Sequence, residues 1–240
     1  MVLFERGKKK EDVPEDTRSL VAQGDECNNR GEFAAALSWF DRAIRRDPHS
    51  ARAYAGKGLA LRNLNRDKEA LVCYNKALEI GPATGEVLQR KGATLNTLGN
   101  HQEALTCFDA ALQADSLYAD AWYEKAVAYG SLGEYQKAAD CFDKVLEITP
   151  DNADAWINKG RALGKLEKFL WAVECFDHGL ALRPGNADVW YYKGISLVHL
   201  RKIPEAYTCF EKAVTINPGH QEAIAAKKEL TAILDQIRRT

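Results

Sequence analysis

The chain has 240 residues, of which 46% are hydrophobic and 28% charged, and its 33 basic and 34 acidic residues leave a net charge of −1. This composition is typical of a folded soluble protein, and the near-neutral charge disfavours a dedicated binder of nucleic acid or of an anionic membrane. No run of about 18 apolar residues occurs, so we expect no membrane-spanning helix.

Residues 1–16 are predicted to form a charged, flexible tail. They include Lys8, Lys9 and Lys10 and several acids, and they lack the apolar stretch of a secretory signal. We expect the lysine run to serve solubility rather than binding.

From Thr17 onward a period of 34 residues runs through six units without an insertion. The units cover residues 17–50, 51–84, 85–118, 119–152, 153–186 and 187–220. Within each unit, repeat positions 4, 8 and 11 form one apolar stripe with helical spacing, and positions 20, 24 and 27 form another. The spacing predicts two antiparallel helices in each unit, and small residues at positions 8, 20 and 27 let them approach closely.

The residues at these positions are strongly restricted. Position 20 is always alanine, and position 32 is proline except for Ser116 in the third unit. Position 4 holds Leu20, Tyr54, Leu88, Trp122, Trp156 and Trp190, and position 24 holds Phe40, Tyr74, Phe108, Phe142, Phe176 and Phe210. This pattern resembles the tetratricopeptide repeat over residues 17 to about 220.

The resemblance implies an all-α fold, a right-handed superhelical solenoid of stacked antiparallel helix hairpins whose first helices line a concave wall. One hairpin cannot bury its own apolar face, so stability comes from stacking its neighbours. Residues 221–240 repeat the first-helix register and then stop, which predicts a solvating C-terminal cap helix and about 13 helices in all.

The turn inside each hairpin carries a further signal at position 15. Gly31, Gly99 and Gly133 suit the left-handed conformation that ends a helix. Glu167 and Arg201 depart from glycine, so the sequence leaves these two turns open.

The six cysteines do not predict a metal or disulfide site. Five of them occupy position 23 of successive units, where helix packing separates equivalent residues by roughly 8–10 Å, too far for a disulfide. No spacing typical of a zinc site, phosphate loop or catalytic motif appears, and the five histidines do not converge on one site. We therefore expect no metal, no cofactor and no enzymatic activity, and free buried thiols favour the cytoplasm.

A lysine stands at position 7 of every unit after the first, and of the cap helix. We predict that each lysine pairs with position 25 of the preceding unit, as in Lys57 with Asp41 or Lys125 with Asp109. Five of the six preceding residues are acidic, and Asn75 is the exception. This interpretation is favoured over a basic ladder for a polyanion.

The first helices also predict a partner-binding groove, since positions 2, 6, 9 and 13 lie opposite the core stripe and positions 5 and 12 flank them. In units 1–3 these residues are Arg18, Asn28, Asn29, Arg52, Arg62, Asn63, Arg90 and Asn96. In units 4–6 they are Tyr123, Ile157, Asn158, Arg161, Tyr191, Tyr192, Ile195 and His199. Tyrosine and arginine are the residue types that carry binding energy at interfaces. If the ligand is one continuous segment, its acidic end should lie along Arg52, Arg62 and Arg90, and its apolar anchor against the aromatic residues.

Two site patterns known in the family can be compared with this groove. The clamp that binds chaperone carboxyl-terminal tails is matched only by Arg90, so that function is disfavoured. The asparagine ladder at position 6 of sugar-transferring members is also absent. The sequence thus predicts a non-catalytic scaffold or adaptor that binds a peptide segment or partner protein, with no nucleic acid and no membrane as partner.

A different function, structural assembly through self-association, stays open. Leu170 and Trp171 occupy positions 18 and 19 of the fifth unit, where the other units have polar or small residues. An outward-facing tryptophan suggests a side patch for a partner or a homo-oligomer. The alternative is that Trp171 folds down over the neighbouring loop.

Overall fold

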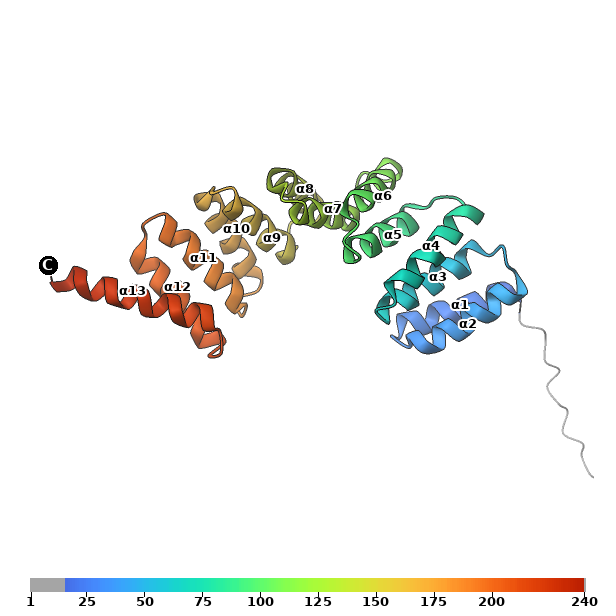
Figure 1. The fold of residues 1–240 in the computed structure, drawn as a ribbon, viewed down its shortest axis with the longest axis horizontal. Helices are drawn as coiled ribbons and strands as arrows, with labels where there is room; N and C mark the ends of the chain where they lie inside the picture. Colours follow the sequence, from blue (N-terminus) through green and yellow to red (C-terminus); the bar gives the residue numbers. More distant parts are fainter. Residues whose placement is uncertain (1–15, 240) are drawn as a thin grey trace, which may run out of the picture. The chain divides into compact units, whose positions relative to one another are not determined.

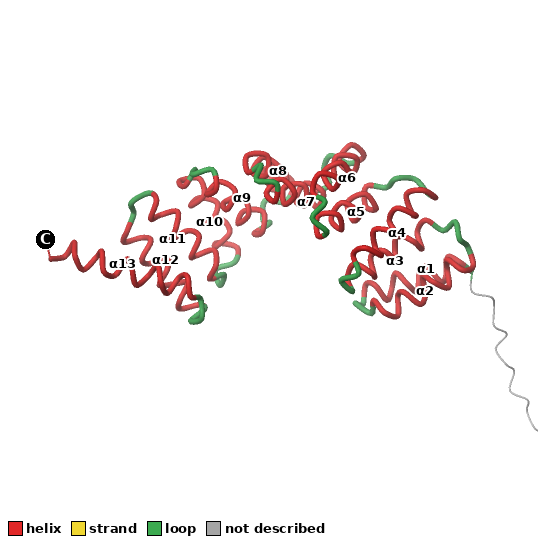
Figure 2. Tube along the Cα trace, viewed as in Figure 1, coloured by secondary structure: helices red, strands yellow, loops and turns green. Residues whose placement is uncertain are grey.

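The computed structural model describes residues 16–239, with side chains as far as Leu234. Apart from Asp16, the predicted N-terminal tail lies outside these residues. Asp16 caps the first helix, because its carboxylate accepts a hydrogen bond of 2.7 Å from the Ser19 backbone N–H. Thirteen helices and no strands occupy the described residues (Figures 1 and 2).

The chain divides into two compact units that join between Leu98 and Gly99. The first unit contains α1 (Thr17–Asn29), α2 (Phe33–Arg46), α3 (Ala51–Asn63), α4 (Asp67–Ile80) and α5 (Gly85–Thr97). Helices α1 and α2 form one hairpin and α3 and α4 a second, and α2 packs on α3 while α4 packs on α5.

The second unit contains α6 (His101–Ala114), α7 (Ala119–Ser131), α8 (Tyr135–Ile148), α9 (Ala153–Lys165), α10 (Phe169–Leu182), α11 (Ala187–His199), α12 (Ile203–Ile216) and α13 (Gln221–Arg239). Three hairpins, α7–α8, α9–α10 and α11–α12, stack in chain order, with α6 packed on α7 and α13 on α12. The connections within and between these hairpins are short turns (Figure 2).

The first helix of each predicted repeat begins where the 34-residue period begins, from Thr17 to Ala187, and α13 begins at Gln221. The boundary between the compact units nevertheless falls inside the third predicted repeat, between α5 and α6. The hairpins confirm the predicted all-α class of fold.

The aromatic residue at position 24 of each repeat is buried in the core of its compact unit. Phe40, Tyr74, Phe108 and Phe210 have no exposed surface, and Phe176 is 2% exposed. Position 8 must be small because a Cβ on Gly160 would lie 2.7 Å from the Phe176 ring.

The turns at position 15 all have a left-handed residue. Gly31, Gly99 and Gly133 have φ between 76° and 81°. Asn65, Glu167 and Arg201 adopt φ of 57–58°. The two turns that the sequence left open therefore keep the same geometry, at the steric cost that a side chain brings in this region.

None of the described helices combines the length and the apolar character needed to cross a bilayer.

Candidate functional site

The first unit has a cleft of about 540 Å³, here called the α1–α5 cleft. Its lining includes Asp25, Asn28, Arg52, Gly56, Glu86 and Arg90 from α1, α3 and α5. It therefore contains two of the arginines predicted to bind a partner, Arg52 and Arg90.

Both arginines already have a carboxylate partner from the chain itself. Arg52 Nη2 lies 2.7 Å from Asp25 Oδ2, and Arg90 Nη2 lies 2.5 Å from Glu86 Oε1. The buried Asn28 amide donates a hydrogen bond of 3.1 Å to the Gly56 carbonyl. The charged groups of the α1–α5 cleft are thus paired with one another, whereas the buried Oδ1 atom of Asn28 accepts no hydrogen bond from the described residues.

The second unit has two clefts that share one helix, α9. The larger, of about 490 Å³, lies between α9 and α11 and is called the α9–α11 cleft. Its lining includes Arg161, Gly164, Lys165, Glu167, Phe169, Tyr191, Tyr192, Ile195 and His199. The smaller, of about 330 Å³, is the α7–α9 cleft and is lined by Val127, Gly130, Tyr135, Asn158, Arg161 and Lys165, among others.

Aromatic side chains form much of the wall of the α9–α11 cleft. The Tyr191 and Tyr192 rings have centroids 5.6 Å apart, and the Arg161 guanidinium carbon lies 5.3 Å from the Tyr192 centroid. Phe169 and His199 stack with centroids 4.1 Å apart and planes inclined by 4°. Tyr191, Tyr192 and Phe169 are only half-buried, so part of this apolar surface is accessible.

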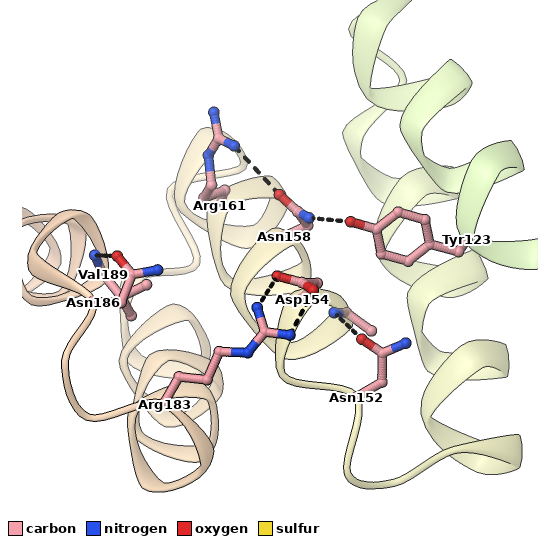
Figure 3. A network of polar contacts seen from close by, with 9 residues as sticks. Tyr123, Asn152, Asp154, Asn158, Arg161, Arg183, Asn186 and Val189 are labelled. Carbon is pink, nitrogen blue, oxygen red and sulfur yellow. Dashed lines mark hydrogen bonds and ion pairs between the residues drawn. The ribbon is translucent and has the colours of Figure 1, made fainter. Parts of the chain in front are cut away.

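A polar network holds the α9 side of the site in place (Figure 3). Asn158 donates from Nδ2 to the Tyr123 hydroxyl at 2.9 Å and accepts from Arg161 Nη1 at 3.3 Å. On the same helix, Asp154 binds Arg183 through two hydrogen bonds of 2.7 and 2.9 Å. Burial raises the pKa of Tyr123, so its hydroxyl stays protonated at neutral pH and keeps a proton to donate.

The structure brings together some of the predicted groove residues and not others. Asn158, Arg161, Tyr191, Tyr192 and His199 line the clefts of the second unit, and Asn158 binds Tyr123. Arg62, Asn63 and Asn96 line none of the clefts described above, and Asn63 donates to the Leu59 carbonyl of its own helix.

The placement of Ile157 on the groove wall is wrong. Ile157 is 8% exposed and belongs to the core of the second unit. A Cβ on Gly179 of α10 would lie 2.7 Å from the Ile157 side chain. The glycine therefore leaves the space that lets Ile157 enter the hairpin.

Sequence reasoning also missed Lys165 and Phe169, which line the α9–α11 cleft. Lys165 follows Arg161 by four residues, a spacing that places both on one helical face and could have identified it. Phe169 is the first residue of α10, outside the positions expected to face the groove, and carried no such signal.

The predicted lysine row is confirmed for the five lysines that face an acidic residue at position 25 of the preceding 34-residue repeat. Lys57 pairs with Asp41 and Lys125 with Asp109, each at 2.6 Å, and Lys227 pairs with Glu211 at 3.0 Å. Lys159 and Lys193 make the equivalent contacts to Asp143 and Asp177. The row belongs to the contact between successive repeats.

None of the six cysteines forms a disulfide, and the five at position 23 are buried. Burial raises the pKa of Cys141 and of Cys175 to about 11, which keeps both protonated and unreactive at neutral pH. The described residues contain no group of side chains arranged to hold a metal ion.

Leu170 and Trp171 are 54% and 53% exposed, so Trp171 is not folded down into the monomer. The Lys168 ammonium lies 5.4 Å from the Trp171 ring and also donates to Gln136.

Family models for the tetratricopeptide repeat match residues 20–83, 85–116, 119–152, 141–174 and 187–220. A search of curated protein sequences gave no match. Among solved structures, the chain is similar to YrrB, described as "a TPR protein with an unusual peptide-binding site", with 25% identity and a TM-score of 0.69. That match covers 79% of this chain and 97% of YrrB.

Two further structures share the fold. PilF of Pseudomonas aeruginosa has 20% identity and a TM-score of 0.76 over 90% of this chain and 96% of its own. A chain of the APC/C hetero-tetramer Cut9–Hcn1 has 20% identity and a TM-score of 0.73 over 91% of this chain, which spans only 43% of that larger chain. With its 34-residue period, its helix hairpins and these matches, the chain belongs to the tetratricopeptide repeat family.

Proposed function

We propose that the protein is a non-catalytic interaction scaffold that binds a peptide segment of a partner protein in the α9–α11 cleft. Tetratricopeptide repeat proteins generally serve protein interaction, and the peptide-binding site of YrrB supports the same use here. The observation that carries the proposal is the accessible aromatic wall of Tyr191, Tyr192 and Phe169 beside a cleft of about 490 Å³. Partly exposed aromatic side chains next to a cation form the kind of surface that dominates binding energy at interfaces.

The proposal can be tested with a pool of short synthetic peptides of random sequence, selected on the immobilised full chain. A selected peptide should bind Tyr192→Ala at least about tenfold more weakly, because a buried aromatic contact often contributes 2 kcal/mol or more. Hydrogen exchange should slow in α9 and α11 when the peptide is bound.

The matched control is Tyr54→Ala, an aromatic truncation in the first unit, at a residue that lines none of the clefts described above. Circular dichroism melts should show both variants folded at the assay temperature. The proposal would be contradicted if the peptides bound the Tyr192→Ala variant and the natural chain with equal affinity and slowed hydrogen exchange only outside α9 and α11.

The alternative function is self-association through the side patch of Leu170 and Trp171, and it is favoured by their exposure. Light scattering over a range of concentrations tests it. A defined oligomer that Trp171→Ala converts to a monomer supports assembly, whereas a monomer at every concentration removes it.

A further inference from the structure

Arg161 and Lys165 are two cations without a carboxylate partner in the described part of the chain. They lie one turn apart on α9, both side chains are exposed, and both line the α9–α11 and the α7–α9 clefts. Two other cations nearby are neutralised, since Lys159 pairs with Asp143 and Arg183 with Asp154. Lys168 donates to the neutral Gln136 and lies over the Trp171 ring, and it lines neither cleft.

The Arg161 guanidinium is held in position before any ligand arrives. Asn158 accepts its hydrogen bond at 3.3 Å, and the Tyr192 ring lies 5.3 Å beneath it. Because a guanidinium offers five donors, these contacts leave donors free for an incoming oxyanion. A side chain that is already ordered also loses less conformational entropy when it binds.

The charged groups that line the two clefts leave a positive balance. Glu167 is the acid among the lining residues, against Arg161 and Lys165, with His199 stacked on Phe169. Apolar surface flanks the cations on both sides, from Val127 and Tyr135 in one cleft and from Tyr192 and Ile195 in the other.

We infer that the segment bound here carries an acidic side chain, a carboxylate or a phosphate, which Arg161 and Lys165 hold, with apolar residues before and after it in the two clefts. This inference rests on the proposed function and names the chemical class of its ligand. It places the anion-binding part of the site on α9, rather than on the arginines of the first unit.

The test uses fluorescent peptides built on one selected sequence and differing at one central residue, which is Glu, phosphoserine, Gln or Lys. Fluorescence anisotropy with the full chain gives the affinities. We expect the Glu peptide to bind about threefold to tenfold more tightly than the Gln peptide, with the Lys peptide weakest, and the difference to shrink at high salt. Comparing the Glu and phosphoserine peptides shows which of the two anionic groups Arg161 and Lys165 hold more tightly.

In the double variant Arg161→Gln, Lys165→Gln, the preference for Glu over Gln should disappear while the Gln peptide keeps its affinity. The matched control replaces Arg18 and Arg62 by Gln, which removes the same charge from residues that line none of the clefts described above. That control should keep the preference.

Two results would overturn the inference: equal affinity for the Glu and Gln peptides, or a preference that survives in the double variant. If the peptides bind equally but lose affinity in Tyr192→Ala, the acidic ligand class is wrong and the proposed function stands. If binding does not depend on Tyr192 either, both are wrong.

Discussion

The α1–α5 cleft and the α9–α11 cleft have similar volumes, about 540 and 490 Å³, and both contain arginine. In the first, Arg52 and Arg90 are paired with Asp25 and Glu86. In the second, Arg161 has a neutral amide and an aromatic ring as neighbours. The comparison teaches that the neighbours of an arginine, rather than its presence, decide whether it is available to a ligand.

The largest expected effect is on stability and concerns one glycine that lines each cleft, Gly56 in the first and Gly164 in the second. A Cβ on Gly56 would lie 2.3 Å from the Phe40 ring, whereas a Cβ on Gly164 meets no atom within 4 Å. Gly56→Ala should lower the free energy of unfolding by about 1–2 kcal/mol, since overpacking outweighs the gain in helix propensity. Gly164→Ala should instead raise it by up to about 1 kcal/mol. Urea denaturation of both variants measures the difference, and a stable Gly56→Ala variant would show that the Phe40 ring can move aside.

The pairing of the arginines in the α1–α5 cleft can be broken directly. In Asp25→Asn, Glu86→Gln, the Arg52 and Arg90 side chains lose their carboxylate partners, and the first unit should gain affinity for the Glu peptide. We expect a gain of about twofold to fivefold, because each exposed pair contributes only about 0.2–1 kcal/mol. Hydrogen exchange should place the new binding on α3 and α5. Unchanged affinity would show that the ion pairs of Arg52 and Arg90 are not what keeps the α1–α5 cleft from binding the peptide.

The hairpin turns of the two compact units differ in the residue that adopts the left-handed conformation. Gly31 adopts the left-handed conformation between α1 and α2, and Glu167 adopts it between α9 and α10. Glu167→Gly should raise the free energy of unfolding by about 0.5–1 kcal/mol through relief of the side-chain clash. Since it also removes an acid from the α9–α11 cleft, affinity for the Glu peptide should rise. A thermal melt together with the anisotropy assay separates these effects, and a lower melting temperature would contradict the first.

The smallest effect compares lysines of the two units. Lys125 in α7 pairs with Asp109, whereas Lys91 in α5 has the neutral Asn75 at the equivalent place. Lys125→Gln should cost about 0.2–1 kcal/mol of unfolding free energy, and Lys91→Gln close to none. Chemical denaturation of both variants in low and high salt measures this, and equal losses would show that the lysine stems rather than the ion pairs matter.

The sequence predicted the fold well because every hairpin repeats the same local choices. The contact between Gly160 and Phe176 is predicted by positions 8 and 24, which recur as a small and an aromatic residue in every repeat. The lysine row is predicted in the same way, because a lysine such as Lys159 recurs 16 residues after an acid such as Asp143. The site was harder to predict, because a cleft depends on contacts between side chains of different helices. Ile157 shows this limit, since the room for its side chain in the core depends on Gly179 of the neighbouring helix.

The ion pairs of the arginines could not be predicted from the repeat period either. Arg52 and Arg161 are equivalent candidates by sequence. In the structure, however, Arg52 forms an ion pair with Asp25 of α1, and Arg161 donates a hydrogen bond to Asn158 of its own helix, α9. The predicted polarity, with the acidic end of a ligand on the arginines of the first unit, rested on that likeness.

The order of the helices in each stack has a consequence for how the chain comes to be folded. The helices that pack together within each unit are adjacent in the chain or next but one, and each lysine ion pair joins residues only 16 apart. Closing such short loops costs little entropy, so folding can nucleate locally and spread from one hairpin to the next. As the chain leaves the ribosome, each new hairpin within a unit can therefore dock on one already formed, and the order of synthesis is also the order of assembly.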